Sequence, residues 1–440
     1  MELHAALSSA GLTTLRLHHA LGSGASRLAL SREWDPELDF AGYARDFEVD
    51  QLACREPIML GDEQARRLLT RCGASAALDL LEELVDAGRH EMVVMQVNAR
   101  LGMRVVNHVH SSVLGRNNGH HAIRAGGVRR HEPDDPEASA LVDGLNLGRG
   151  MSFKNAAAEI PFGGCKMTVQ CAPFALGDAE RLGFLAFVID SGHFMTGPDM
   201  GFSPELADVL RAGYTRQIVG GLRGPLGPTR SPTARGTFFA LRASAQFAWG
   251  SEALAGRSVA IQGLGAVGLP LARLCAQEGA RLIVADPDPA RLARARAELG
   301  ELTVVEPGRV LEVEADVVCP CAVGAVLDPA SIARLRCRIL CGSANNQLAG
   351  TSQAREIELA VAVARRGIVY APEWVHNIAG VVAGYEEYAN GEHARLANIE
   401  PHVERVCRDG VAQLLEESRA SGRTPTDHAY ARVERVIYPE

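Results

Sequence analysis

The stretch Val259-Ala-Ile-Gln-Gly263-Leu-Gly265-Ala-Val-Gly268 decides the fold of the second half of the chain. It begins as a short apolar strand, continues as a Gly-x-Gly-x-x-Gly turn, and leads into an apolar helix that ends near Gln277. A second predicted strand ends at Asp286, eighteen residues after the last glycine of the turn. A lone glycine pattern carries little weight, but strand, turn, helix, strand and acid occur here in the order that binds a dinucleotide.

This turn also predicts how the dinucleotide would bind. Glycines let the backbone approach a pyrophosphate, and the helix N-terminus offers free N–H groups. Asp286 would bind the adenosine ribose hydroxyls and repel a 2′-phosphate, which favours NAD over NADP, although Arg291 follows closely. A packing turn without a nucleotide is the alternative, and it fits the complete βαβ unit less well. The predicted cofactor contacts in the turn are Gly263, Leu264, Gly265, Ala266, Val267 and Gly268.

Strand and helix patterns continue on both sides of this unit. Predicted strands at 281–285, 315–319 and 338–341 alternate with helices, which is typical of a doubly wound parallel sheet. The Gly- and Pro-rich residues 222–232 predict a linker before it. Towards the N-terminus we expect paired strands over 92–97 and 103–113, a helix over 138–158, a turn at Gly163-Gly164 and a strand over 169–173.

The only lysines of the sequence are Lys154 and Lys166, among 45 basic residues. Arginine stays charged at any working pH, whereas the pKa of lysine falls readily on burial. Two ammonium groups suit an anionic substrate: one can hold a carboxylate, and the other can act as a base near neutral pH. Asp199, in a Gly/Pro loop, could pass protons to an amine or simply cap its loop. A coding bias against lysine is the alternative explanation for the composition.

Composition and charge exclude several classes of protein. The 440-residue chain has a net charge of −8 and no run of Lys or Arg, so we expect no nucleic-acid partner. A basic, apolar leader is not seen, and no apolar window reaches membrane-spanning length, so neither a signal peptide nor a membrane partner is expected. The ten cysteines are scattered, and Cys319-Pro-Cys321 lacks a two-residue spacer. Reduced cysteines in a cytoplasmic protein fit best.

Seven motifs in register carry a family resemblance. They are Lys154-Asn-Ala-Ala-Ala, Gly163-Gly-Cys-Lys166, Pro198-Asp-Met-Gly201, Gly263-Leu-Gly-Ala-Val-Gly268, Cys319-Pro-Cys-Ala322, Gly342-Ser-Ala-Asn-Asn-Gln347 and Gly367-Ile-Val-Tyr-Ala-Pro372. From about residue 77 to the C-terminus, the chain resembles the Glu/Leu/Phe/Val dehydrogenase family, and its leucine and phenylalanine dehydrogenase branch most.

The resemblance implies NAD-dependent, reversible oxidative deamination of an L-α-amino acid to a 2-oxo acid and ammonia. It implies that Lys154 holds the substrate carboxylate, that Lys166 is the base that activates water, and that Asp199 moves the proton on the amine. It places Gly127 beside the substrate, and Asn346 and Thr233 near the nicotinamide and the carboxylate. Cys321 joins the predicted cofactor contacts.

The resemblance also implies a two-domain α/β fold that assembles as a homo-oligomer, a dimer or larger. We expect an N-terminal extension of unknown role at 1–75, a substrate and oligomerisation domain at 76–230 that the C-terminal helices 386–440 complete, and a Rossmann-type NAD-binding domain at 231–385.

The substrate side chain is predicted from four pocket positions of leucine-specific relatives, which fall on Ala125, Gly197, Val381 and Gly384. Glutamate-specific members place a lysine at the first position, so glutamate is not expected. Small residues at the first and last positions enlarge an apolar pocket, which favours a bulky apolar or aromatic amino acid such as phenylalanine or tryptophan. A leucine or valine dehydrogenase is the alternative.

Three departures from the family pattern lie where the active site is expected. Cys165 replaces a glycine beside the base, Asn377-Ile-Ala-Gly380 replaces Asn-Ala-Gly-Gly, and Arg116–His121 are extra residues that could refill the pocket. A non-catalytic relative that binds NAD or amino acids as a sensor or partner is therefore a second hypothesis, and an enzyme of a specialised pathway is a third.

The histidines His108, His110, His120 and His121 raise the question of a metal site. His108 and His110 share a strand face, as metal ligands can, but no cysteine or carboxylate completes a set. We expect no metal.

Overall fold

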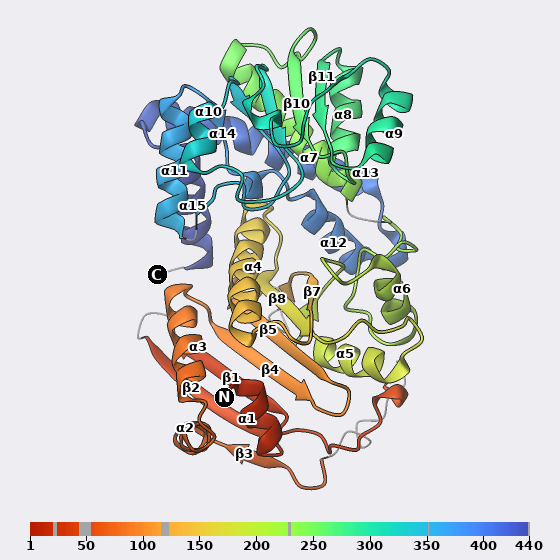
Figure 1. Cartoon of the computed structure of the whole chain (residues 1–440), viewed down its shortest axis with the longest axis vertical. Helices are drawn as coiled ribbons and strands as arrows, with labels where there is room; N and C mark the ends of the chain where they lie inside the picture. The colour runs from red at the N-terminus through yellow and green to blue at the C-terminus, as the bar shows by residue number, and fades with distance from the viewer. Residues whose placement is uncertain (21–23, 44–53, 116–122, 228–229, 351, 439–440) are drawn as a thin grey trace. The chain divides into compact units, whose positions relative to one another are not determined.

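The computed structural model describes residues 1–20, 24–43, 54–115, 123–227, 230–350 and 352–438. The chain divides into two compact units, and Figure 1 labels most of their helices and many of their strands. The first contains Met1–Ala156, Ile160–Pro228 and Glu387–Glu392, and the second contains Ala157–Glu159, Thr229–Glu386 and His393–Glu440. The chain passes from the first to the second within the predicted linker, residues 222–232.

A mixed sheet with the order β3-β2-β1-β4-β5-β8-β6-β9 forms the centre of the first unit, and β7 pairs with β8. Its strands are β1 (Thr14–Ala20), β2 (Ala25–Arg32), β3 (Ile58–Leu60), β4 (Met92–Asn98), β5 (Met103–Ser111), β6 (Arg124–Ala125), β7 (Val128–His131), β8 (Gly163–Gln170) and β9 (Phe194–Met195). Its helices are α1 (Leu3–Ser9), α2 (Asp62–Arg71), α3 (Ser75–Ala87), α4 (Glu137–Ala157), α5 (Ala179–Ser191) and α6 (Pro204–Gly213). The antiparallel pair β4–β5 and the helix α4 confirm the expected elements.

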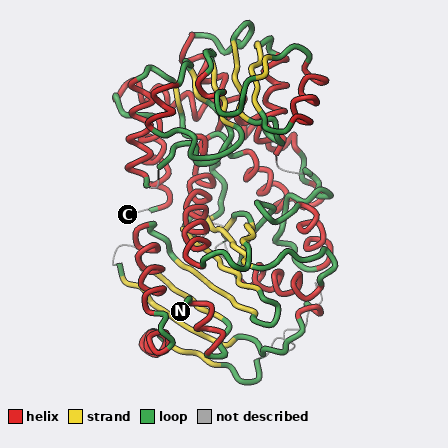
Figure 2. Tube along the Cα trace, viewed as in Figure 1, coloured by secondary structure: helices red, strands yellow, loops and turns green. Residues whose placement is uncertain are grey.

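Alternating side chains give this sheet two apolar faces, each covered by helices. On one face, Val93 and Met95 of β4 pack in a buried cluster with residues of α1, α2, α3 and α4. On the other face, Met167 and Val169 of β8 pack in a cluster with residues of α5 and α6. Figure 2 shows the strands as yellow traces between the red helices. Residues from distant parts of the sequence thus hold each strand in position.

The described part of residues 1–75 contributes three strands to this sheet and groups with the first unit, whereas the sequence set 1–75 apart from the domain at 76–230 as an extension of unknown role. β1 pairs antiparallel with β4, so that Leu15 lies opposite Met95, and β2 and β3 continue the sheet beyond β1. The strand partner lies about eighty residues away along the chain, and local patterns do not reveal such a pairing.

The predicted turn at Gly163-Gly164 was wrong, because these glycines begin strand β8. A Cβ atom on Gly163 would lie 2.3 Å from the carbonyl oxygen of Ser111. One on Gly164 would lie 2.2 Å from the backbone nitrogen of Ser152. The glycines serve close packing of the strand rather than chain reversal, and the strand expected at 169–173 therefore begins earlier.

The second unit contains a parallel sheet with the order β12-β11-β10-β13-β14-β15. Its strands are β10 (Ser258–Gln262), β11 (Arg281–Ala285), β12 (Thr303–Val304), β13 (Val317–Pro320), β14 (Ile339–Leu340) and β15 (Val369–Tyr370). Its helices are α7 (Arg230–Trp249), α8 (Gly268–Gln277), α9 (Pro289–Leu299), α10 (Pro329–Arg334), α11 (Gln353–Arg365), α12 (Ala379–Asn390, which continues into the first unit), α13 (Leu396–Glu404), α14 (Val411–Ser421) and α15 (Pro425–Ile437). This order confirms the doubly wound sheet. The order of the strands along the chain runs outward in opposite directions from β10 and from β13, and such sheets bind ligands at the point where the order reverses.

The C-terminal helices α13, α14 and α15 belong to this second unit, whereas the sequence placed 386–440 with the first. The rings of Trp374 and Tyr430 lie 5.3 Å apart, and the Tyr430 hydroxyl donates to Glu356 on α11. A Cβ atom on Gly236 of α7 would lie 3.1 Å from the Cys407 sulfur, so this part of the chain packs closely on α7. Only 387–392 groups with the first unit.

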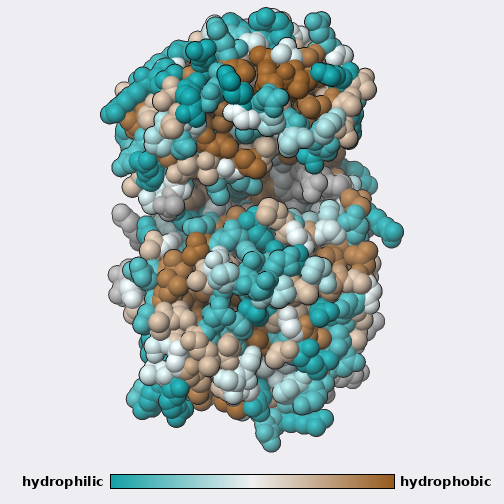
Figure 3. All heavy atoms as spheres, in the orientation of Figure 1, coloured by the Kyte–Doolittle hydropathy of each residue, from teal (hydrophilic) through white to brown (hydrophobic). Residues whose placement is uncertain are grey.

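Within the described residues, no helix combines the length and the apolar character that a bilayer crossing needs. The face drawn in Figure 3 mixes hydrophilic and apolar side chains over both units.

Candidate active site

Lys166 lies near the middle of β8, on the sheet face that α4 covers. Its neighbours Cys165 and Met167 belong to the apolar cluster on the opposite face, so strand alternation turns Lys166 toward α4. The Lys166 side chain is 6% exposed. Burial lowers the pKa of its ammonium group, although the neighbouring carboxylate of Asp199 acts in the opposite direction.

Cys165, the departure beside the base, does not share the face of Lys166. Burial raises the pKa of its thiol to about 12, so the side chain stays neutral. Cysteine in place of the family's glycine therefore changes the apolar core on the face of β8 opposite Lys166. It adds no nucleophile beside the Lys166 amine.

Asp199 pairs with Lys166 from the loop that follows β9. Its Oδ1 accepts a hydrogen bond from the backbone N–H of Met200 at 2.7 Å, and its Oδ2 lies 3.4 Å from the Arg129 guanidinium. Burial alone would raise the pKa of Asp199, but the charges of Lys166 and Arg129 outweigh burial and lower the pKa to about 2. The carboxylate caps its loop and also forms an ion pair, whereas its expected function of passing protons to an amine stays a prediction.

Gly127 lies directly beside this pair. A Cβ atom there would lie 3.1 Å from Lys166 Nζ and 3.2 Å from Asp199 Cβ. The backbone N–H of Val128 donates to the carbonyl of Gly197 at 2.9 Å, which fixes the two loops against each other. A side chain at position 127 would fill the space in front of the amine, so glycine keeps that space open.

Lys154 is half-buried in the last turn of α4. Small residues four apart let this helix approach the sheet closely: a Cβ atom on Gly144 would lie 2.2 Å from the His108 ring, and one on Gly148 would lie 2.6 Å from the His108 carbonyl oxygen. The Gly148 Cβ atom would also lie 3.5 Å from the Lys166 backbone nitrogen, so the helix with one lysine packs on the strand with the other.

Two of the four predicted pocket positions, Ala125 and Gly197, lie in the first unit. Ala125 is 1% exposed in β6, opposite Gly164 of β8. Val381 and Gly384 lie on α12 in the second unit. The grouping of all four into one pocket stays a prediction, and the extra residues Arg116–His121 lie outside the described residues.

The glycine turn fits a dinucleotide. Gly263 has a φ of +88°, and a Cβ atom on Gly268 would lie 1.9 Å from the Gly263 carbonyl oxygen, so both glycines are needed for the turn itself. A Cβ atom on Gly265 would meet only the Arg291 guanidinium, at 3.8 Å. Its backbone is thus open to a phosphate at the start of α8.

Asp286 directly follows β11 and lies beside this turn. Its Oδ2 accepts from the backbone N–H of Leu264 at 2.7 Å and lies 3.5 Å from the Arg291 guanidinium. The Cys321 N–H donates to the Gln262 carbonyl at 2.9 Å, so Cys321 also lies at the carboxyl ends of the strands. Thr233 is half-buried in the first turn of α7. Ala266 and Val267 complete the turn.

Asn346 adopts a left-handed backbone conformation, with a φ of +52°. Its backbone N–H donates to Glu373 Oε1 at 2.7 Å, and its carbonyl accepts from Ala325 at 2.7 Å. The Glu373 carboxylate also accepts from the Tyr370 hydroxyl at 3.3 Å. Glu373 was not predicted from the sequence, although it directly follows the Ala-Pro motif that ends at Pro372. Arg129 was likewise not singled out.

The buried histidines lie in the packed interior. Burial lowers the pKa of His108 and of His110 to about 3, so both rings are neutral. His108 Nε2 lies 2.9 Å from the Thr168 hydroxyl, and the His110 ring packs edge-on against His90. Within the described part of the chain, no three His, Cys, Asp or Glu side chains form a group that could hold a metal ion. His120 and His121 lie outside it.

Fold and site together define a class of protein: an oxidoreductase with a Rossmann-type unit and a buried Lys–Asp pair. The comparisons agree with this class. A leucine dehydrogenase of Thermoactinomyces intermedius is 32% identical over 343 residues, which cover 75% of this chain and 89% of that protein. A phenylalanine dehydrogenase of Bacillus thermotolerans is 35% identical over 358 residues, covering 79% and 88%. No family model matches the chain.

Among solved structures, L-tryptophan dehydrogenase from Nostoc punctiforme superimposes with a TM-score of 0.67 at 28% identity, covering 81% of this chain and 98% of that one. The chain belongs to the Glu/Leu/Phe/Val (amino acid) dehydrogenase family. It is an oxidoreductase that acts on CH–NH2 donors and deaminates an amino acid with a nicotinamide cofactor.

Proposed function

We propose that this enzyme catalyses the NAD-dependent, reversible oxidative deamination of a bulky apolar or aromatic L-α-amino acid, such as phenylalanine or tryptophan. The observation that carries the proposal is the buried Lys166–Asp199 pair, which faces the space left by Gly127. An amine of lowered pKa beside an ionised carboxylate can exchange a proton with a bound amine or a water molecule. Leucine or valine is the alternative substrate.

In this proposal the residues have separate functions. Lys154 holds the substrate carboxylate as a fixed cation, and the open position at Gly127 receives the substrate beside it. Asp199 accepts and returns the proton at the substrate nitrogen. Lys166, once neutral, removes a proton from the water that attacks the imine carbon, after which ammonia leaves and the 2-oxo acid remains.

The second unit provides the cofactor site. When bound, the nicotinamide ring accepts the hydride from the substrate Cα. The turn Gly263–Gly268 and the start of α8 would hold the pyrophosphate, and Asp286 would accept the ribose hydroxyls. Thr233, Cys321 and Asn346 would line the nicotinamide side. The Asp286 carboxylate supports NAD over NADP.

A panel of amino acids tests the substrate. We expect the highest kcat/KM with phenylalanine or tryptophan, because the small residues Ala125 and Gly384 occupy two of the positions that the family resemblance assigns to an apolar side-chain pocket. Leucine should be weaker by roughly 10–200-fold, since one methylene in such pockets is worth about 1–3 kcal/mol. NADH formation measures each rate, and parallel assays with NADP compare the cofactors. A clear preference for valine or glutamate would contradict the pocket argument.

The variant Lys154→Arg tests the carboxylate clamp. Arginine keeps the charge but spreads it over a planar fork that does not fit a site made for an ammonium group. We expect KM for the amino acid to rise roughly tenfold or more, as expected from losing part of a charged hydrogen bond worth about 1.5–3 kcal/mol, with a smaller change in kcat. The control is Arg149→Lys on the same helix, whose guanidinium lies over the Phe153 ring. A variant with unchanged KM would exclude Lys154 from carboxylate binding.

We further propose that the protein is a cytoplasmic homo-oligomer of two or more copies. Its cysteines are all free thiols, which supports a reducing compartment. Assembly is proposed from the family resemblance alone, and mass photometry of the purified protein tests it.

A further inference from the structure

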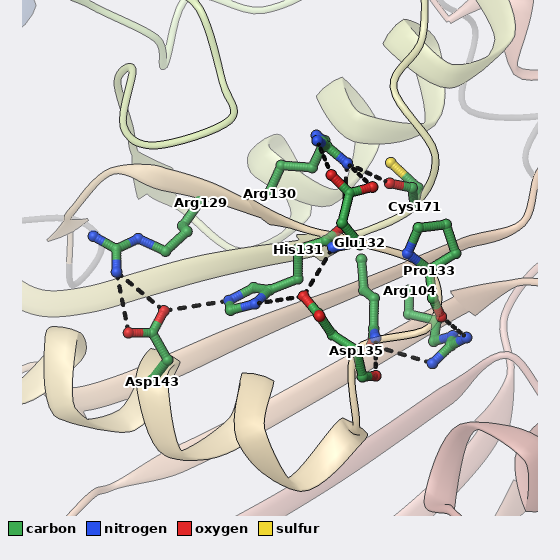
Figure 4. Close-up of polar contacts among 10 residues, drawn as sticks. Arg104, Arg129, Arg130, His131, Glu132, Pro133, Asp135, Asp143 and Cys171 are labelled. Carbon is green, nitrogen blue, oxygen red and sulfur yellow. Dashed lines mark hydrogen bonds and ion pairs between the residues drawn. The ribbon is translucent and has the colours of Figure 1, made fainter.

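Two neighbouring arginines of β7 point to different surroundings, as Figure 4 shows. The guanidinium of Arg129 lies 3.1 Å from Asp143 on α4 and 3.4 Å from Asp199. The guanidinium of Arg130 lies 2.6 Å from Glu132 and donates to the Cys171 carbonyl at 2.9 Å. Strand alternation thus puts one arginine beside the Lys166–Asp199 pair and the other away from it.

Arg129 is held in place from its far side. Both of its contacts with the Asp143 carboxylate, at 3.1 and 3.2 Å, come from Nη1, which leaves Nη2 directed at Asp199. Asp143 is in turn 3.2 Å from His131, and His131 is 3.5 Å from Asp135. The guanidinium is therefore a fixed charge, because carboxylates from α4 and from the loop after β9 lie on both sides of it.

The charges around Lys166 determine what this fixed cation does. Asp199 favours the protonated amine, and so, from a greater distance, does Asp143. Arg129 is the opposing cation: it disfavours a second positive charge on Lys166 and shares the Asp199 carboxylate. Without Arg129, both carboxylates would act on Lys166 alone, and the amine would hold its proton more strongly.

We propose that Arg129 is a positioning residue, which orients Asp199 and keeps Lys166 able to release its proton during turnover. The proposal rests on the proposed function of Lys166 and acts through it, because Arg129 is assigned no contact with the substrate. Asp143 and His131 support Arg129 from the α4 side.

The test compares Arg129→Gln with the matched control Arg130→Gln. We expect kcat/KM to rise with increasing pH as Lys166 loses its proton. We expect Arg129→Gln to move the rising limb to higher pH, and each unit of that movement lowers the rate at neutral pH about tenfold. Arg130→Gln should leave the limb where it is. In the conservative variant Arg129→Lys, the rising limb should lie close to its pH in the parent protein.

The two-lysine composition provides a second measurement that needs no turnover. Lysine labelled with 13C at Cε gives signals from Lys154 and Lys166, which the Lys154→Arg variant assigns. In Arg129→Gln the Lys166 signal should titrate at higher pH than in the parent protein. The proposal would be overturned if Arg129→Gln changed neither the titration of the Lys166 signal nor the pH of the rising limb. It would also be overturned if Arg130→Gln shifted both as much as Arg129→Gln does. Full activity of Lys166→Ala would instead overturn the proposed function, so the two failures are distinguishable.

Discussion

Replacing Lys166 with alanine is expected to lower kcat for oxidative deamination about 10²–10⁴-fold, the range that loss of a general base produces. The Lys166 amine is buried beside Gly127, and the sequence has one other lysine, Lys154, which lies on α4. Asp199 would lose the charge that lowers its pKa most, but a carboxylate beside the Arg129 guanidinium is still a weaker base for water than an amine. Cofactor binding should change little, because the glycine turn lies in the other unit.

Steady-state NADH formation measures kcat, and quenching of protein fluorescence by NADH measures cofactor affinity. Small primary amines added to the Lys166→Ala protein should restore part of the activity, since the cavity left by the side chain can admit them. The melting temperature shows whether the variant is folded. Parent-like turnover in a folded Lys166→Ala protein would contradict the assignment of the base.

The sequence predicted the parallel sheet and glycine turn of the second unit well because their signals are local. The Gly263–Gly268 turn, the strand before it and Asp286 lie within thirty residues, and each element of the pattern has its own physical reason. The two lysines were found by their rarity, and the structure packs their helix and strand together through Gly144 and Gly148.

The remaining features depend on contacts between distant segments. Gly163-Gly164 could be read as a turn because the residues that crowd them, Ser111 and Ser152, come from β5 and α4. Of the strands within 1–75, β1 pairs with β4, far along the chain, and β2 and β3 continue the sheet beyond β1. Arg129 and Glu373 became visible only through their partners, since a single arginine or glutamate has no sequence signal of its own.

Replacing Gly148 with alanine is expected to destabilise the protein by about 1–3 kcal/mol, the usual cost of overpacking. The new Cβ atom would lie 2.6 Å from the His108 carbonyl oxygen and 3.5 Å from the Lys166 backbone nitrogen. Backbone atoms of a central strand cannot move aside alone, so α4 must shift away from β5 and β8. Since α4 carries Lys154 and β8 carries Lys166, activity should fall together with stability.

Gly150 provides the matched control in the same helix. A Cβ atom there would have no neighbour within 4 Å among the described residues. Alanine at this position removes the entropic cost of a helical glycine, so Gly150→Ala should stabilise the protein by about 0.5–1 kcal/mol and leave kcat and KM unchanged. Urea unfolding followed by circular dichroism gives both free energies. If Gly148→Ala were as stable as Gly150→Ala and equally active, α4 would not lie against the strands as closely as the structure places it. The spacing between the two lysines would then have to be set by another contact.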